Sequence, residues 1–108
     1  MRPMFGKVWD SHVVVPRDSG PSLIYIDRDM VHEGSFHAFA DLRRRGLPVR
    51  RPKQGFGTAD HYAPTSGRKI TDASTPEIEK LIRKFDENMR WSGARYFGLA
   101  DPHQGIVH

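Results

Sequence analysis

The chain has 108 residues, of which 37% are hydrophobic, and its 17 Lys and Arg residues outnumber its 13 acidic residues. This length and polar composition predict a single partial domain over residues 1–108 that packs against further protein, and the positive charge favours an anionic partner. The absence of cysteine excludes disulfides and any iron–sulfur site built from these residues alone. Without a long apolar run or a secretory leader, the sequence predicts a cytoplasmic chain with no membrane partner.

The N-terminal quarter is predicted to form a helix and a buried strand. Apolar side chains recur at helical spacing over residues 4–13, which predicts a helix of two to three turns. The β-branched residues that follow end at Pro16, before a turn cluster. The continuous apolar run 22–26 predicts a strand buried on both faces of a sheet. The charged residues 27–29 would then lie at its carboxyl edge, where open α/β sheets bind ligands.

The middle of the chain is predicted to contain one helix and one strand. Ser35 is a candidate N-cap for a helix over residues 36–45, and Gly46 is placed to end it. The inward residues of this helix are expected to be Phe36, Phe39, Ala40 and Leu42. Residues 54–59 predict a short strand that leads into a Pro-, Thr-, Ser- and Gly-rich loop.

The longest predicted helix covers residues 75–91. The segment Ser74-Thr75-Pro76-Glu77 suggests a capping box at its start, and Gly93 is expected to end it. One apolar stripe has helical spacing and consists of Ile78, Leu81, Ile82, Phe85 and Met89. Residues 95–99 predict a further strand, and residues 105–108 are strand-like. Alternating strands and helices indicate an α/β fold.

Asp60 and His61 are the first candidates for acid–base chemistry. A carboxylate that contacts an imidazole orients the ring and fixes its tautomer, which suits it to proton transfer near neutral pH. The ordinary alternative is a turn or cap, because Asp-His dipeptides are common. His32 and Glu33 have no second ligand at metal-site spacing, so no metal site is expected.

A cluster of basic residues is the densest charge feature, and it consists of Arg43, Arg44, Arg45, Arg50, Arg51 and Lys53. One interpretation is a solvated helix end and loop. A second is a carboxylate site, because the planar guanidinium pairs with carboxylates through two hydrogen bonds. A nucleic-acid partner is not favoured, because no aromatic residues are interleaved with these arginines.

Seven short motifs occur in order along the chain: WDSHVV at 9–14, LIYIDR at 23–28, VHE at 31–33, FHAF at 36–39, VRRP at 49–52, DH with PT between 60 and 65, and DP with QGIVH between 101 and 108. Together they resemble the opening part of the large subunit in the 3-isopropylmalate dehydratase family of the aconitase superfamily. The resemblance implies part of an aconitase-type α/β/α domain. It also implies the dehydration and rehydration that convert 2-isopropylmalate to 3-isopropylmalate in leucine biosynthesis.

The resemblance implies catalytic roles for three residues. His61, supported by Asp60, matches the histidine that protonates the departing hydroxyl, and His108 matches a second active-site histidine. The pair Tyr62–Ala63 stands where the family usually has Asn-Val.

Four further residues fall in the motifs of the family as substrate-binding candidates. Arg28, Arg50 and Arg51 are candidates for orienting an anion, and His37 stands where the family usually has a substrate-contacting glutamine. The resemblance thus implies a dicarboxylate-type substrate.

The family uses a [4Fe–4S] cluster, whose cysteine ligands are absent from these residues, and a catalytic base from a separate small subunit. The expected partners are therefore that small subunit, the missing remainder of the large subunit, or both. We expect no cofactor in this chain and no dehydratase activity from the chain alone. The alternative is a truncated, non-catalytic relative that binds a partner subunit or an anionic metabolite.

Overall fold

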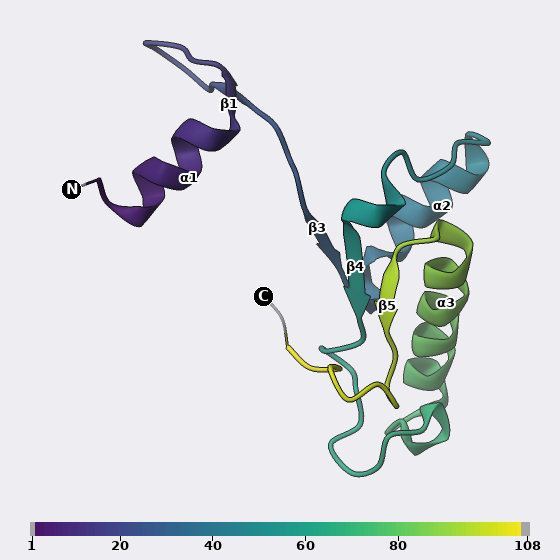
Figure 1. The fold of residues 1–108 in the computed structure, drawn as a ribbon. Coiled ribbons are helices and arrows are strands. Elements are labelled where there is room, and N and C mark those ends of the chain that lie inside the picture. Colours follow the sequence, from purple (N-terminus) through teal and green to yellow (C-terminus); the bar gives the residue numbers. More distant parts are fainter. Residues whose placement is uncertain (1, 107–108) are drawn as a thin grey trace.

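The computed structural model describes residues 2–106, which form two regions (Figure 1). An N-terminal arm, residues 2–28, extends away from a core region, residues 29–106, that contains a parallel sheet and the helices α2 (Phe36–Arg44) and α3 (Pro76–Ser92). The mixture of helices with a parallel sheet confirms the predicted α/β class.

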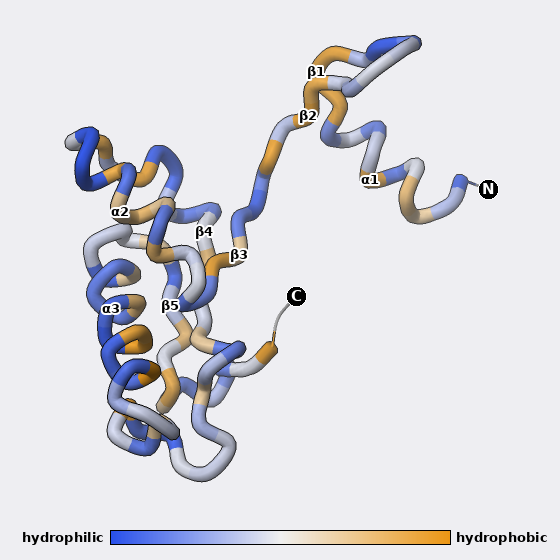
Figure 2. The backbone as a smooth tube through the Cα atoms, turned by 180° about the vertical axis from the view of Figure 1, so that it is seen from behind, coloured by the Kyte–Doolittle hydropathy of each residue, from blue (hydrophilic) through white to orange (hydrophobic). Residues whose placement is uncertain are grey.

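The arm consists of helix α1 (Met4–His12) and an antiparallel ribbon of β1 (Val13–Val15) and β2 (Leu23–Ile24). The predicted N-terminal helix is confirmed, but none of the described residues 2–28 is buried. Figure 2 shows apolar colour along β1, β2 and the segment that follows them.

The prediction of a strand over residues 22–26 buried on both faces is wrong. Only Leu23 and Ile24 pair, at the edge of the ribbon, and Leu23 remains 56% exposed. The run is apolar, but its residues from Leu23 to Ile26 all remain exposed. The first strand of the parallel sheet begins only at Asp29, so residues 27–29 lie at an amino end rather than a carboxyl edge.

The core region has a three-stranded parallel sheet in the order β3-β4-β5. These strands are β3 (Asp29–Val31), which the sequence did not predict, β4 (Gly55–Thr58) and β5 (Arg95–Phe97). Helices α2 (Phe36–Arg44) and α3 (Pro76–Ser92) lie on the same side of the sheet in both views (Figures 1 and 2). Three 3-10 turns complete the core region: η1 (Glu33–Ser35), η2 (Pro52–Gln54) and η3 (Ile70–Asp72).

Helix α3 provides half of the buried hydrophobic residues of the described core. Its residues Ile82, Phe85 and Met89 are at most 1% exposed, whereas Leu81 is only partly buried. Helix α3 can pack closely on the sheet because β4 has a glycine at position 57. A Cβ atom on Gly57 would lie 2.5 Å from the Met89 methyl carbon. The core therefore forms where a glycine-containing strand faces the apolar stripe of a long helix.

The predicted ends of α3 are largely confirmed. The Thr75 hydroxyl accepts a hydrogen bond from the Ile78 N–H at 3.3 Å, which satisfies one of the exposed donors of the first turn. Gly93 ends the helix in the left-handed region at φ 70°. Thr75 thus acts as the N-cap.

The start of α2 differs from the prediction. The Ser35 hydroxyl does not cap α2; it accepts a hydrogen bond from the His32 N–H at 3.3 Å and so closes η1. Of the residues expected to face inward, Phe39 is buried and Phe36 is 38% exposed. The end of α2 is as predicted, because Gly46 has φ 65° and donates a hydrogen bond to the Arg43 carbonyl.

The C-terminal segment carries no strand in its described part. Residues 104–106 are irregular, so the strand-like prediction for 105–108 is not confirmed there, and residues 107–108 lie outside the described residues. Within residues 2–106, no helix combines the length and apolar character that crossing a membrane requires.

Candidate active site

Polar side chains collect where the three parallel strands end. His32 and Glu33 follow β3, Asp60 and His61 follow β4, and Gln104 lies beyond β5. The carboxyl ends of parallel strands meet at one edge of a sheet, so residues far apart in the chain come together there. This edge is the candidate site.

Asp60 and His61 form a hydrogen-bonded pair of a buried carboxylate and an exposed imidazole. The His61 Nδ1 lies 2.5 Å from Asp60 Oδ1; the Asp60 side chain is 1% exposed and that of His61 is 46% exposed. An ionised carboxylate only accepts hydrogen bonds, so the Nδ1 of His61 carries a proton. The other ring nitrogen, Nε2, then belongs to a ring that solvent or a ligand can reach.

The ring of His32 stacks on the ring of His61. The ring centroids are 4.2 Å apart and the ring planes differ by 22°. The Nδ1 of His32 accepts the Gly34 N–H at 3.2 Å, which fixes the orientation of the stacked ring. Sequence reasoning did not pair His32 with His61, because the two residues follow different strands.

Glu33 is the residue of the candidate site that sequence reasoning missed. Its side chain has no exposure, and its two carboxylate oxygens accept backbone N–H bonds from Asp60 at 3.1 Å and from Tyr62 at 2.6 Å. These bonds bracket His61 on both sides and compensate the cost of burying the acid. The available signal was an acid directly after an apolar strand, but that strand, β3, was itself not recognised.

The segment after β5 supports the same loop. The Gln104 side-chain amide donates to the Ala59 carbonyl at 2.7 Å, immediately before Asp60. A tight turn precedes Gln104, in which the His103 backbone N–H donates to the Asp101 carboxylate at 2.8 Å and lowers the pKa of that carboxyl group. The loop that carries His61 is therefore held from both neighbouring strands.

The donor atoms of the cluster fit proton transfer better than a metal or an iron–sulfur cluster. One ligand atom each from His32, Glu33, Asp60 and His61 lies within 4.8 Å of the others. Both Glu33 oxygens and the His32 Nδ1 already accept backbone hydrogen bonds. A [4Fe–4S] cluster is held mainly by thiolates, and the sequence has none, so these residues do not fit that group.

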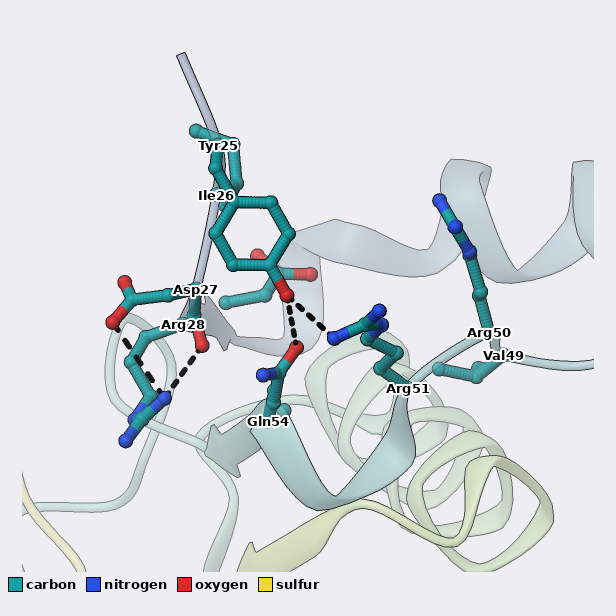
Figure 3. Close-up of a pocket in the computed structure, with 10 residues that line it drawn as sticks. Tyr25, Ile26, Asp27, Arg28, Val49, Arg50, Arg51 and Gln54 are labelled. Atoms are coloured by element: carbon teal, nitrogen blue, oxygen red, sulfur yellow. Dashed lines mark hydrogen bonds and ion pairs between the residues drawn. The ribbon is translucent and has the colours of Figure 1, made fainter. Parts of the chain in front are cut away.

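Of the other predicted site residues, the structure separates the three arginines from Asp60 and His61. Arg28, Arg50 and Arg51 line a pocket at the amino end of β3 and β4 (Figure 3). His37 is exposed in the first turn of α2 and packs on the Phe36 ring at 3.8 Å. His108 lies outside the described residues.

The basic cluster of the sequence is divided in the structure. Arg44 and Arg45 pair with Asp41, and the Arg43 guanidinium lies 4.3 Å from the centre of the Trp91 ring. Arg50 and Arg51 line the pocket at the amino end of the sheet.

Comparison with known proteins shows the family to which the sequence motifs belong. Residues 6–108 match the model of the aconitase family (aconitate hydratase). The chain is 39% identical over 112 residues to a 3-isopropylmalate dehydratase large subunit from Cytophaga hutchinsonii. That alignment covers 99% of this chain but only 23% of the relative, so the chain spans about a quarter of the length of the protein it matches. No solved structure matches the chain.

Proposed function

The chain belongs to the aconitase family, and from that premise we propose that it supplies the proton-donating pair of a hydro-lyase of the isopropylmalate dehydratase type. His61 is the proposed acid and Asp60 its orienting partner. The observation that carries the proposal is the buried Asp60 carboxylate on Nδ1 of an exposed His61 ring, 2.5 Å away, at the carboxyl edge of a parallel sheet.

In the proposed step, the imidazolium of His61 donates its Nε2 proton to the hydroxyl oxygen of the substrate. The C–O bond breaks, water departs and His61 is left neutral. The proton on the adjacent carbon passes to a base outside this chain as the C=C bond forms. Asp60 keeps the ring oriented through the step, because its contact to Nδ1 is unaffected when Nε2 loses its proton.

The same proposal covers the partner subunit, the substrate and two further histidines. The Cytophaga relative is a 3-isopropylmalate dehydratase large subunit, which supports a small-subunit partner and a 2-isopropylmalate-type dicarboxylate as substrate. His37, exposed in the first turn of α2, is a proposed substrate contact, and His108 is a proposed second active-site histidine. We place the reaction in the cytosol and the iron–sulfur ligands outside this chain.

The test is an assay of the chain alone and of a chimaera. The purified chain, after anaerobic iron–sulfide reconstitution, should not turn over 2-isopropylmalate, and turnover would contradict this part of the proposal. In the chimaera, the chain replaces the matching segment of the Cytophaga large subunit, which is then assayed with its small subunit. His61→Gln should lower kcat about 10²- to 10⁴-fold, the usual contribution of a positioned acid.

The controls separate acid catalysis from loss of an imidazole in general. His12→Gln, in the arm, should leave kcat of the chimaera unchanged. Asp60→Asn should produce a smaller loss than His61→Gln, because the acid is retained but its orientation is not. Full activity of the His61→Gln chimaera would exclude His61 as the acid.

A second candidate function is a non-catalytic module that binds a partner subunit or an anionic metabolite. The separation of Arg28, Arg50 and Arg51 from the Asp60–His61 pair favours it, because an anion at these arginines would not need the catalytic edge. Saturable binding of a carboxylate by the chain alone, without turnover, is the outcome that this function requires.

A further inference from the structure

We propose that the pocket at the amino end of the sheet is a separate binding site for a small carboxylate- or phosphate-bearing metabolite, anchored by Arg51 and Arg50. The pocket has a volume of about 250 Å³ and combines residues of the arm with residues that lead into β4 (Figure 3). This inference does not depend on the acid–base role of His61.

The charges that line the pocket leave two arginines for a ligand. Arg28 pairs with Asp27, which also contacts His12. Within residues 2–106, no carboxylate lies within 4.0 Å of the guanidinium of Arg50 or Arg51. An anion that reaches this pocket therefore meets guanidinium groups that are not already neutralised.

The Arg51 guanidinium is held in place rather than free in solvent. It donates to the Tyr25 hydroxyl at 2.7 Å and lies 5.6 Å from the centre of the Tyr25 ring. The Tyr25 hydroxyl in turn donates to the Gln54 side-chain oxygen at 3.3 Å, and Figure 3 shows this chain across the pocket. Part of the entropy cost of ordering a long side chain for a ligand is thus met before binding.

The lining also limits the class of ligand. Three arginines face two aspartates, Asp27 and Asp29, which leaves an excess of one positive charge and favours a small anion over a polyanion. Val49 and Ile26 add apolar surface beside the polar groups. A guanidinium binds a carboxylate or a phosphate oxygen pair through two parallel hydrogen bonds, so both anion types share this chemistry.

The pocket lies at the opposite end of the sheet from His61. Gly55 begins β4 beside the pocket and Thr58 ends it near Asp60, and three strand steps separate them by roughly 10 Å. A ligand at Arg51 would contact both the arm, through Tyr25, and the core region, through Gln54. Binding should therefore stabilise the contact between the two regions.

The test is a titration of the 108-residue chain with L-malate and, separately, with inorganic phosphate at low ionic strength, followed by NMR of backbone amides. We expect saturable shifts at residues 25–29 and 50–55. Arg51→Ala and Arg50→Ala should each weaken binding about 10- to 100-fold, the usual range for a lost charge-assisted hydrogen bond. Arg83→Ala removes an exposed arginine from α3 and is the matched control; it should leave the affinity unchanged.

Each outcome decides the proposal. Saturation by malate alone identifies a carboxylate site, and saturation by phosphate alone identifies a phosphate site. Failure of both anions to saturate, or equal weakening by Arg83→Ala and Arg51→Ala, would overturn it. His61→Gln should leave the titration unchanged, so this test and the test of the acid–base role fail independently. Tyr25→Phe keeps the ring but removes the hydroxyl, and it should weaken binding less than Arg51→Ala.

Discussion

The arm and the core region use the same kinds of residue with different results. Helices α1 and α3 are both amphipathic, yet no residue of α1 is buried in the described structure, whereas five residues of α3 are. Helix α3 packs on a parallel sheet whose central strand contains Gly57. Helix α1 adjoins a two-stranded ribbon, which is too small a surface to cover a helix.

The same contrast applies to two Asp–His ion pairs. Asp60 and His61 pair in the core region with the carboxylate buried, and Asp27 pairs with His12 in the arm with both side chains partly exposed. A solvated pair contributes little and is screened by salt, whereas a pair with a buried carboxylate is screened much less. The contribution of an amphipathic helix or a charge pair to stability thus depends on what packs against it.

The largest expected difference concerns apolar residues of the two helices. Phe85→Ala should lower the free energy of unfolding of the core region by about 3–5 kcal/mol, because it leaves a cavity among fully buried side chains. Phe5→Ala in α1, where the ring is 72% exposed, should change it by less than about 0.5 kcal/mol.

Two tryptophans allow the regions to be measured separately, because Trp9 lies in α1 and Trp91 in α3. Urea unfolding followed by Trp91 fluorescence in a Trp9→Phe background reports on the core region. The reciprocal Trp91→Phe background reports on the arm. Equal losses for the Phe85 and Phe5 variants would show that α1 is buried in solution.

The close approach of α3 to the sheet predicts a smaller effect. Gly57→Ala should destabilise the core region by about 1–3 kcal/mol, because the added methyl group would overlap the buried Met89 side chain. Gly105→Ala is the control, since a Cβ there meets nothing within 4 Å. Both are measured by urea unfolding with Trp91 fluorescence, and an unchanged midpoint for Gly57→Ala would contradict the packing.

The two backbone hydrogen bonds that Glu33 accepts predict a local loss of stability at the candidate site when Glu33 is changed. Glu33→Gln replaces one of two acceptor oxygens by a donor, so either the Asp60 or the Tyr62 N–H loses its partner. We expect a loss of about 1–3 kcal/mol, the usual cost of a buried unsatisfied group. Amide hydrogen exchange at residues 60–62 should accelerate more than exchange within α3. Uniform acceleration would indicate general destabilisation instead.

The smallest effect is expected from pH acting on the arm. The Val8 carbonyl and then the Asp27 carboxylate raise the pKa of His12 above 6.5, and His12 lowers the pKa of Asp27 below 3.8. The contribution of His12 is therefore complete below pH 6.5 and is lost as pH rises through its raised pKa. That of Asp27 is complete above pH 3.8 and is lost as pH falls through its lowered pKa.

The contact between α1 and the segment after β2 should thus be strongest between pH 3.8 and 6.5. Trp9 fluorescence during a pH titration in the Trp91→Phe background measures this contact. His12→Gln should remove the dependence above pH 6.5, and added salt should weaken it. A dependence that persists in His12→Gln would assign it to another group.

Local chemistry could be read from the sequence where it depends on near neighbours in the chain. The caps and the apolar stripe of α3, the glycine that ends α2 and the Asp60–His61 pair all involve residues a few positions apart. The run 22–26 was misread because strand propensity does not specify a partner strand. Strand β3 was missed because Asp29, Met30 and Val31 show no alternation and become a strand only beside β4.

By itself the sequence determined the class of fold, the long helix and the family resemblance that the comparisons confirm. Only the tertiary structure determined that His32 and Glu33 face Asp60 and His61, and that Arg28, Arg50 and Arg51 lie at the other end of the sheet. The physical reason is that parallel pairing sets which chain segments share an edge. Pairing is a long-range contact, and residue order along the chain does not encode it locally.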